Sequence, residues 1–516
     1  MKKIHLLLIT GILISAAACS STGEPTSTQS GPIVPAGDES IQTDIITDEA
    51  AFFDLEWDDT SLYSSGLVAS EQAVLDHVEG MTVYRINLSV DESLNQIEGR
   101  QHVLYTNTED APLESIYLRM YANLFGGRSS ILELTADGEP ATYTMELEDS
   151  ALRVDLAQPL EPGERIELGM RFDLEVPQEM GGNYGLFSSY DNRLLLHVFY
   201  PVIPVYDDEG WNVEIPPEYG DVSFFDAALY LVRVEAPAGL VWVTSGVELG
   251  YEKAGELDLH VFAAGPARDF YMAASPDFEV METQVGETRI RSFAFSNRSV
   301  GAEAAMTTTA AAVQSYNARF GPYPYTEFDI VGAPMEAWGM EYPGATAISD
   351  MLYDTEAYYG DTPALVYLES TVAHEVAHQW FFNLVGTDQV DEPWMDEALV
   401  QYATGLYFLD QYGSEGYDSY RESWIDRWNR LDQAPIPIGE PVSEYPGAAY
   451  SAIIYGRGPL FVEALAREMG QDGFNTFIRA YTDANRWDTA YPAELRAMAE
   501  DACACDLSTL FAEWVE

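Results

Sequence analysis

Apolar and polar residues alternate along much of the first half of the chain, which is the pattern of β-strands. Every second residue is apolar over 84–90, and the same two-residue period runs over 166–176. Between these runs, Glu161-Pro162-Gly163-Glu164 is typical of a turn. From about residue 81 to residue 276 we therefore expect a β-rich domain, either a curved, saddle-like sheet or a sandwich.

The second half of the chain changes to the period of helices. Helical patterning begins over 302–320, and short strands are expected over 326–332 and 345–349. After Asp361 nearly every segment is predicted to be helical, with later helices over 393–412, 459–469, 473–483 and 492–502. These patterns predict an α+β multidomain fold, with a β-rich N-terminal domain over 47–275 and a mostly helical domain over 276–516.

A predicted helix over 364–384 carries the motif His374-Glu375-Val376-Ala377-His378. Residues four apart lie on one face of a helix, so both imidazoles can bind one metal ion. Glu375 lies beside them, where a general base is needed. Since the helix is expected to continue to a stop at Gly386, the motif is predicted to sit in its middle. This pattern indicates a zinc hydrolase.

The third metal ligand is expected to be a carboxylate, because no histidine follows the motif. The seven histidines are His5, His77, His102, His197, His260, His374 and His378. Glu397 follows His378 after eighteen intervening residues, in the next expected helix. We therefore predict that His374, His378 and Glu397 hold one Zn²⁺ per chain and leave a fourth position open. Without a further histidine, a tyrosine is expected to stabilise the oxyanion.

At these residues the chain resembles the gluzincin zinc aminopeptidases, the family of aminopeptidase N and leukotriene hydrolase. The spacing from His374 to Glu397 is similar, and so are the flanking Gln379-Trp380-Phe381 and Trp394-Met395-Asp396-Glu397-Ala398. The resemblance covers residues 80–516, approximately. It implies a β-rich N-terminal domain joined to a thermolysin-like, mostly helical catalytic domain.

Two further motifs take part in the resemblance. Trp338-Gly339-Met340-Glu341-Tyr342 is similar to the family's G-x-M-E-N element, which implies that Glu341 binds the free α-amine of a peptide substrate. Tyr455-Gly456-Arg457-Gly458 is similar to the family's Y-x-K-G element. This second likeness implies that Tyr455 is the hydroxyl donor expected above.

Some positions depart from the family pattern. Asp396 stands where the family commonly has Asn, and Arg457 replaces Lys. Trp338 and Tyr342 replace the first Gly and the last Asn of the exopeptidase element. The family's proline-plus-glutamine element has no clear counterpart, and 197–211 occupies about its place. These departures leave the metal chemistry intact and bear on the strictness of aminopeptidase specificity.

The predicted function is removal of N-terminal residues from peptides outside the cytoplasm by a zinc metallopeptidase. Zinc activates water and polarises the scissile carbonyl. Glu375 takes a proton from the water and returns one to the leaving amine, while Tyr455 stabilises the oxyanion. Two alternatives stay open: a thermolysin-type endopeptidase, and a non-catalytic surface protein of the same fold that binds peptides.

The composition of the chain limits the classes of partner that the protein is expected to bind. The chain has 85 acidic and 25 basic residues and a formal net charge of -60. Nucleic acids and anionic membrane surfaces are therefore expected to repel its folded domains. Such acidity resembles that of proteins from high salt, and it also fits an acidic extracellular enzyme from ordinary surroundings. Peptide substrates are the expected partners, and no feature indicates an obligate protein partner.

The first 19 residues have the pattern of a lipoprotein signal peptide. Met1-Lys2-Lys3 precede an apolar stretch, and small residues lead to Cys19, which we expect to be lipidated. A plain signal peptide or an anchor helix is the alternative, since Ala16 stands where Leu is usual. Residues 20–46, rich in Ser, Thr, Pro and Gly, are expected to be a flexible tether. The protein is thus predicted to be extracytoplasmic, either anchored to the cell membrane or secreted.

Only Cys503 and Cys505 follow the predicted signal peptide, so the fold is not expected to be stabilised by a framework of disulfide bonds. Their spacing is compatible with a redox or metal pair. A packing or incidental role is favoured, because no histidine or further cysteine lies nearby in the sequence.

Overall fold

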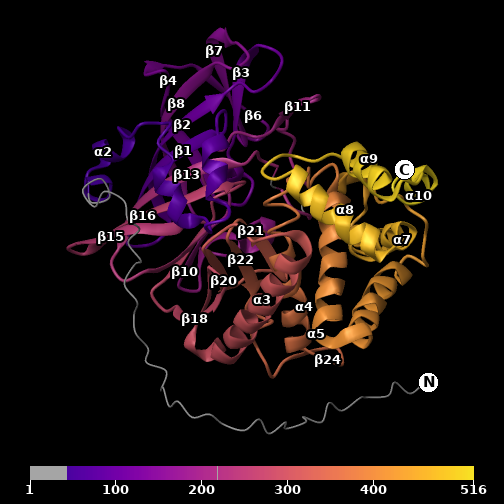
Figure 1. Ribbon diagram of the computed structural model, residues 1–516. Coiled ribbons are helices and arrows are strands. Elements are labelled where there is room, and N and C mark those ends of the chain that lie inside the picture. The colour runs from indigo at the N-terminus through magenta and orange to yellow at the C-terminus, as the bar shows by residue number, and fades with distance from the viewer. Residues whose placement is uncertain (1–43, 218, 223) are drawn as a thin grey trace. The chain divides into compact units, whose positions relative to one another are not determined.

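The computed structural model describes residues 44–516, except 218 and 223. A β-rich region over 82–294 is followed by a mostly helical region, as predicted (Figure 1). The predicted signal peptide, the predicted lipidation site Cys19 and the first part of the predicted tether lie outside the described residues. Within the described part of the chain, no helix has the length and apolarity that a bilayer span requires.

An eight-stranded sheet forms the centre of the β-rich region, in the order β15-β16-β13-β1-β2-β8-β4-β5. β1 pairs in parallel with β13 and antiparallel with β2, which in turn pairs with β8. Apolar side chains of β8 are buried at alternate positions, for example Leu168 and Phe172, which is the predicted two-residue period. The strands are β1 (Thr82–Val90), β2 (Gln96–Thr106), β4 (Arg128–Ala136), β5 (Glu139–Pro140), β8 (Arg165–Glu175), β13 (Ala228–Pro237), β15 (Val247–Ala254) and β16 (Leu257–Ala267).

Two smaller sheets share a buried apolar cluster with this sheet. One contains β3 (Leu113–Arg119), β7 (Ala151–Leu160) and β6 (Tyr143–Glu146). The other contains β14 (Val241–Thr244), β17 (Met272–Ser275), β10 (Arg193–Leu196) and β9 (Phe187–Tyr190). Residues from all three sheets meet in one core, which is the layered packing of a sandwich.

A further sheet of five strands carries the residues that matter for the site. Its order is β18-β19-β20-β22-β21, with β21 at the edge. The strands are β18 (Glu279–Val285), β19 (Thr288–Ala294), β20 (Glu327–Ala333), β21 (Gly339–Tyr342) and β22 (Ala345–Ser349). The strands predicted over 326–332 and 345–349 are therefore confirmed. β18 and β19 form a hairpin at the start of the region 276–516, which is predicted to be mostly helical, and α3 (Ser299–Phe320) starts after it.

The remaining chain is helical, as expected (Figure 1). The main helices are α4 (Ala364–Ala377), α5 (Pro393–Asn429), α6 (Ala448–Ala452), α7 (Gly458–Met469), α8 (Gln471–Ala484), α9 (Pro492–Cys503) and α10 (Ser508–Trp514). α5 contains a kink at Gly413, which has φ 71° and ψ -163°. The helix predicted over 393–412 ends at this kink, and a second helical segment follows it.

The helix that carries the histidine motif is shorter than predicted. α4 ends at Ala377, and His378 is its C-cap, so the motif occupies the last turn and not the middle. Beyond it, the amides of Asn383 and Leu384 donate to carbonyls five residues back. Phe382 adopts φ 152°, a conformation that a non-glycine residue rarely takes. Sequence periodicity does not reveal such a turn, because its residues are as apolar as those of the helix.

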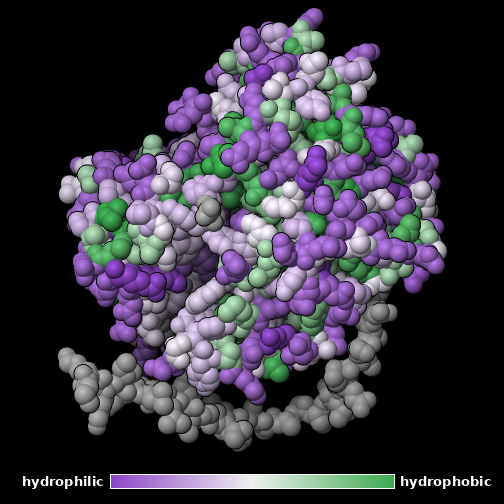
Figure 2. Space-filling view, turned by 180° about the vertical axis from the view of Figure 1, so that it is seen from behind, coloured by the Kyte–Doolittle hydropathy of each residue, from purple (hydrophilic) through white to green (hydrophobic). Residues whose placement is uncertain are grey.

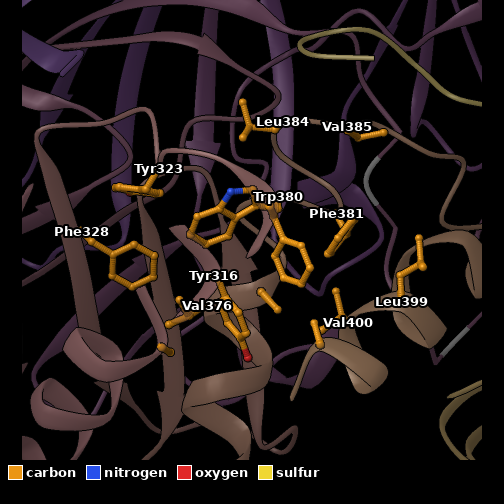
Figure 3. Packing of buried hydrophobic residues seen from close by; sticks show 14 of the residues in the cluster. Tyr316, Tyr323, Phe328, Val376, Trp380, Phe381, Leu384, Val385, Leu399 and Val400 are labelled. Carbon is orange, nitrogen blue, oxygen red and sulfur yellow. The ribbon is translucent and has the colours of Figure 1, made fainter. Parts of the chain in front are cut away.

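Trp380 anchors the turn after α4 to the helical core (Figure 3). Its indole is fully buried and donates a hydrogen bond to the carbonyl of Gly321 over 3.0 Å. The ring centroids of Tyr316 and Trp380 lie 5.6 Å apart in an edge-to-face arrangement. Contacts of this kind hold the end of α4 against α3, so the histidine motif rests on a rigid base.

The predicted tether does not extend to Ile46. Residues 44–47 are helical, and the side chains of Ile45 and Ile46 are buried in the large apolar cluster. A short helix, α2 (Glu49–Phe53), follows and buries Phe52 in the same cluster. Burial of these large apolar side chains stabilises the folded segment, whereas the Ser- and Gly-rich composition further upstream offers no such gain.

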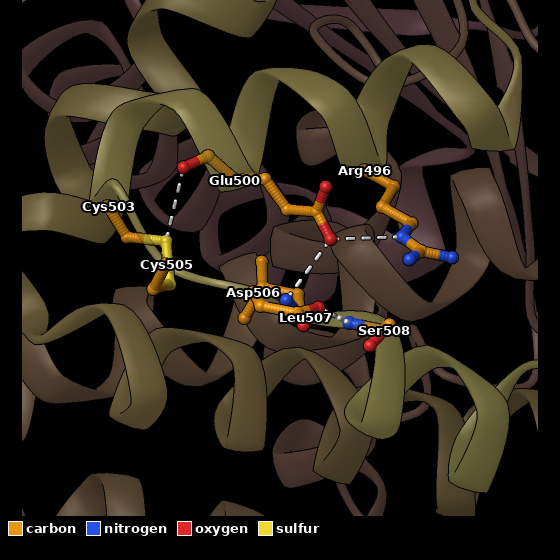
Figure 4. Close-up of a disulfide and its surroundings, with 7 residues drawn as sticks. All are labelled: Arg496, Glu500, Cys503, Cys505, Asp506, Leu507 and Ser508. Atoms are coloured by element: carbon orange, nitrogen blue, oxygen red, sulfur yellow. Dashed lines mark hydrogen bonds and ion pairs between the residues drawn. A yellow bond between two sulfur atoms is a disulfide. The ribbon is translucent and has the colours of Figure 1, made fainter.

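Cys503 and Cys505 form a disulfide bond (Figure 4), so the expected packing or incidental role is wrong for this pair. Ala504 between them is in the left-handed conformation at the end of α9. The side chain of Glu500 accepts hydrogen bonds from Arg496 and from the amide of Leu507 nearby. Because the bond closes a very short loop, it constrains the end of α9 and little else.

Candidate functional site

Three ligand atoms converge at the end of α4. The Nε2 atoms of His374 and His378 lie 3.2 Å apart. Oε2 of Glu397, in the first turns of α5, lies 3.2 Å from Nε2 of His374. The same oxygen lies 3.9 Å from Nε2 of His378. All three residues are buried.

These separations suit a zinc ion. Bonds of about 2.0–2.1 Å in a tetrahedral arrangement place neighbouring ligand atoms roughly 3.3 Å apart. Oε2 of Glu397 is buried and has no hydrogen-bond partner among the described residues. Such an oxygen costs free energy unless a cation binds it. His374, His378 and Glu397 thus form a candidate zinc site with the predicted ligands.

A second carboxylate orients His378. Nδ1 of His378 donates to Oδ1 of Asp396 over 2.8 Å, and both side chains are fully buried. This hydrogen bond leaves the Nε2 lone pair of His378 facing the other two ligands. A carboxylate that holds a metal-binding histidine from behind raises its basicity and fixes its ring.

Gln389 links the carboxylate of Asp396 to that of Glu341. Its Nε2 donates to Oδ2 of Asp396 over 2.7 Å and to Oε1 of Glu341 over 2.9 Å. The group Glu341, His378 and Asp396 also has ligand atoms close together, but these contacts already occupy it. Sequence reasoning missed Gln389, which lies in the connection between α4 and α5 and belongs to no recognised motif.

Burial and crowded negative charge set the pKa values around the site. Burial raises the pKa of Glu341 to about 7, and the charges of Asp396 and Glu397 act in the same direction. Burial likewise raises the pKa of Glu375 well above its ordinary value. Burial would also raise the pKa of Glu397, but His374 and His378 lower it to about 2. The negative charge is therefore held at Glu397, beside the two imidazoles.

Glu375 lies against the edge strand β21. A Cβ atom at Gly339 would overlap the carboxylate of Glu375, so only glycine allows this close approach. α4 packs along both β21 and β22. The proposed general base is thus fixed at the boundary between the zinc helix and the edge of the sheet.

Glu341 lies on the same face of β21 as Gly339, because side chains two apart in a strand point the same way. It pairs with Thr346 of β22 and is buried. Its one side-chain hydrogen bond among the described residues comes from Gln389. The structure therefore brings Glu341 to the site from an edge strand, two positions from the residue that touches Glu375.

Tyr455 also lies beside the candidate zinc ligands. Its hydroxyl donates to Oε1 of Glu397, and its ring centroid lies 6.0 Å from that of His374. It belongs to a π-helical turn, η7 (Ile453–Arg457), a feature that is frequent at functional sites. Arg457 of the same turn donates instead to the carbonyls of Ile436, Glu513 and Trp514, away from the ligands.

The β-rich region contributes Asp221, which sequence reasoning also missed. Burial raises the pKa of Asp221, and the charges of Glu341 and Glu397 raise it further, so its carboxyl group is close enough to the site for these charges to act on it. Its loop is held by a hydrogen bond from the amide of Gly220 to the hydroxyl of Tyr184 over 2.9 Å. An aspartate in a loop of a very acidic chain carries no signal in the sequence.

The segment 197–211 does not supply a comparable polar group at its first residue. His197 is buried, and neither ring nitrogen has a hydrogen-bond partner among the described residues. Burial lowers its pKa to about 3, so the ring stays neutral. His197 packs edge-to-face on Tyr342, at a centroid distance of 5.5 Å. Its role is to support β21 by packing.

Comparison with known protein families agrees with this geometry. Residues 304–514 match the Peptidase family M1 domain. The matched segment begins within α3, ends within α10 and contains all three candidate zinc ligands.

Among curated proteins, the chain is similar to aminopeptidases. It is 23% identical over 408 residues to Aminopeptidase M1-D of Oryza sativa subsp. japonica, an alignment that covers 73% of this chain and 43% of that protein. It is 26% identical over 206 residues to Aminopeptidase N of Streptomyces lividans, covering 38% of this chain and 23% of the relative. The chain thus spans less than half the length of these two relatives.

Solved structures show the same fold. An M1 zinc metallopeptidase from Deinococcus radiodurans superposes with a TM-score of 0.60 at 19% identity, covering 84% of this chain and 94% of that chain. A mutant of that protein bound to a Tyr-Ser-Ala substrate gives a TM-score of 0.61 at 19% identity, with the same coverage. The β-rich region followed by a mostly helical region therefore has the same fold as these M1 metallopeptidase structures.

Proposed function

We propose that this protein is a zinc-dependent aminopeptidase that removes N-terminal residues from peptides outside the cytoplasm. The observation that carries the proposal is the convergence of His374, His378 and Glu397, with Glu375 beside them and Glu341 on the adjoining strand. The match to the M1 domain and the similarity to aminopeptidases support the same function.

Each residue of the site has a distinct part in hydrolysis. Bound zinc would activate water and polarise the scissile carbonyl. The carboxylate of Glu375 accepts a proton from the attacking water and passes one to the leaving nitrogen. We assign to the hydroxyl of Tyr455 the donation of a hydrogen bond to the carbonyl oxygen as negative charge develops there, which is worth roughly 10²–10³ in rate.

Glu341 selects the first peptide bond. A carboxylate at this position pairs with the α-ammonium group of a peptide and so places the bond after the first residue near Glu375. A structural relative bound to the short peptide Tyr-Ser-Ala supports peptides as the substrate class.

Replacement of the general base tests the chemistry. Glu375→Gln keeps the shape of the side chain but cannot take a proton, so we expect kcat to fall on the order of 10²–10⁴-fold. The zinc content, measured by mass spectrometry of the metal, stays at one ion per chain. Full hydrolysis of aminoacyl amides by this variant would refute the proposal.

Blocking the substrate amine tests the exopeptidase mode. We compare a free peptide with its N-acetylated form, which removes the positive charge that Glu341 would bind. Loss of cleavage on acetylation supports an aminopeptidase. Equal cleavage of both forms, at internal bonds, identifies an endopeptidase of thermolysin type.

Lipidation of Cys19 and anchoring at the cell membrane are part of the proposal. They are supported by the sequence of residues 1–19, which has the charged start, apolar stretch and small residues before cysteine of a lipoprotein signal. Mass spectrometry of the N-terminal peptide from the membrane fraction tests this. A Cys19→Ser variant is expected in the soluble extracytoplasmic fraction, and an unmodified Cys19 in the native protein rules out the anchor.

A further inference from the structure

Three aromatic side chains gather beside the site in a place where no recognised motif requires them. We call Trp338, Tyr359 and Tyr367 the aromatic cluster. The ring centroids of Trp338 and Tyr367 lie 4.6 Å apart in an edge-to-face arrangement. Tyr359 lies 6.3 Å from Trp338 and 5.8 Å from Tyr367. Each pair is within the distance at which aromatic rings attract one another.

Two residues of the aromatic cluster pack against the protein, and the third is exposed to solvent. Tyr359 and Tyr367 are partly buried and pack against the large apolar cluster of the helical region. The side chain of Trp338, in contrast, leaves 41% of its surface exposed. An exposed indole that packs against partly buried rings is a surface on which another apolar side chain gains burial at little cost in side-chain entropy.

The cluster adjoins the catalytic elements on two sides. Trp338 directly precedes Gly339, the residue that touches Glu375. Tyr367 lies seven residues before His374 on α4, which is about two helical turns along the same face. The cluster therefore lies next to the proposed general base, on the side away from His378.

The order of residues along β21 gives the direction of the substrate. Glu341 holds the α-ammonium group, Gly339 lies at Glu375, and Trp338 is the next residue outward. Trp338 lies in the bend just before β21, three residues from Glu341. Three residues of chain span at most roughly 10 Å, the length of about three residues of an extended peptide. β21 is an edge strand, along which an extended peptide can lie.

We infer that the aromatic cluster binds an aromatic or large apolar side chain at the second or third residue of the peptide, just after the bond that is cut. This inference rests on the proposed aminopeptidase function and adds a preference in the leaving part of the substrate. The ring faces of Trp338 and Tyr367 supply the contact, and the preference is independent of the first residue.

The test uses four amidated peptides: Ala-Phe, Ala-Gly, Ala-Gly-Phe and Ala-Gly-Gly. We expect the native enzyme to cleave Ala-Phe-amide or Ala-Gly-Phe-amide more efficiently than its glycine counterpart, by on the order of tenfold in kcat/KM. Trp338→Ala removes this preference and leaves cleavage of the glycine peptides within about twofold. Trp338→Phe retains part of the preference, since it keeps an aromatic ring.

A matched control separates the cluster from a general effect of losing an exposed aromatic residue. Tyr143 in β6 is 40% exposed, close to the value for Trp338, and lies in the β-rich region. Tyr143→Ala is expected to keep the full preference. If Trp338→Ala folds poorly by circular dichroism, Tyr359→Ala serves as the second variant and is expected to weaken the preference with unchanged zinc content.

The possible failures are distinguishable. If the native protein cleaves none of the four peptides, the proposed function fails and the inference with it. If the native protein cleaves phenylalanine and glycine peptides equally, only the inference fails. It also fails if Trp338→Ala slows all peptides by the same factor, because a structural role acts on every substrate alike.

As a second readout, binding of the same peptides to the Glu375→Gln variant is measured by competition with a fluorescent peptide. When Trp338→Ala is added, the Kd for the preferred phenylalanine peptide is expected to rise on the order of tenfold. The Kd for its glycine counterpart is expected to stay constant. Equal changes in both Kd values overturn the inference.

Discussion

At the scale of single residues, the site holds more carboxylates than a zinc ion needs. Glu397 is the proposed ligand, Glu375 the base and Glu341 the amine acceptor, while Asp396 and Asp221 carry no such part. Unpaired, these charges repel one another in a buried environment. Hydrogen-bond donors offset this repulsion between carboxylates. The side-chain amide of Gln389 donates two of these hydrogen bonds, one to Glu341 and one to Asp396.

We predict that Gln389→Ala reduces kcat/KM for aminoacyl amides on the order of 10- to 100-fold. The reason is that Glu341 and Asp396 lose their shared donor, so the amine acceptor and the support of His378 both shift. Steady-state kinetics and zinc analysis measure the effect. Gln433→Ala, at an exposed glutamine bonded to Asn429, is the control and is expected to keep full activity. If Gln389→Ala has the same kcat/KM as the native enzyme, the hydrogen bonds from Gln389 to Glu341 and Asp396 have no role in activity.

A buried aspartate far from the ligands predicts a pH effect on stability. Burial raises the pKa of Asp269 to about 6 from an ordinary value of 3.8, although Phe270 and Tyr200 donate hydrogen bonds to it. The folded state therefore binds a proton more tightly than the unfolded state. Between pH 3.8 and about 6 the free energy of unfolding falls as pH rises, by about 3 kcal/mol as an order of magnitude.

In Asp269→Asn, the part of the fall in the free energy of unfolding that comes from Asp269 is expected to be absent, because asparagine does not titrate. Urea unfolding of the native protein and the variant, at several pH values from about 4 to 7, measures the difference between their slopes. Parallel pH profiles for the two proteins contradict the prediction. Other acidic groups contribute equally to both profiles and cancel in the comparison.

At the scale of elements, the site depends on how closely α4 approaches β21. Gly339 has no side chain, and Glu375 occupies the space that a Cβ atom would take. The edge position of β21 leaves room for a peptide beside it. Small changes in the spacing of these two elements therefore move the base relative to the substrate.

We predict that Gly339→Ala lowers kcat on the order of 10²-fold, because the added methyl group displaces the carboxylate of Glu375. Enzyme kinetics and thermal unfolding measure activity and folding separately. Gly473→Ala in α8 is the control, since its Cβ would make only ordinary contact, 3.7 Å from Met469. Unchanged kcat in Gly339→Ala means that the base tolerates displacement.

At the scale of the whole molecule, charge and the contact between the two regions matter most. Arg268 follows β16, and its guanidinium donates to the carbonyls of Phe225, Asn383 and Asp488. This buried side chain joins the β-rich region to the mostly helical region. Outside such contacts, hydrophilic side chains cover most of the face seen in Figure 2.

The net charge of -60 predicts that salt stabilises the fold. Raising NaCl from about 0.1 M to about 1 M shortens the Debye length from about 10 Å to about 3 Å, which screens repulsion among surface carboxylates. We expect Tm at pH 7 to rise, measured by circular dichroism. A Tm that is constant or lower at high salt contradicts the prediction and argues against adaptation to high salt.

The candidate zinc ligands and the order of elements could be predicted from the sequence alone. A two-residue period predicted the strands, a helical period predicted the mostly helical region, and the spacing of His374, His378 and Glu397 predicted the candidate ligands. These features are local, or they repeat patterns of residue type, so they can be read without knowing which segments meet. The same reasoning failed at the end of α4, where Phe382 takes a backbone conformation that its side chain disfavours.

Only the tertiary structure decided which distant side chains share the site. Asp221 comes from the β-rich region, Gln389 from a connection between helices, and Trp338 meets Tyr359 and Tyr367 across separate elements. Their residue types are common in this chain and form no pattern along it. What makes them functional candidates is proximity, and proximity between residues far apart in sequence is set by packing of the whole fold.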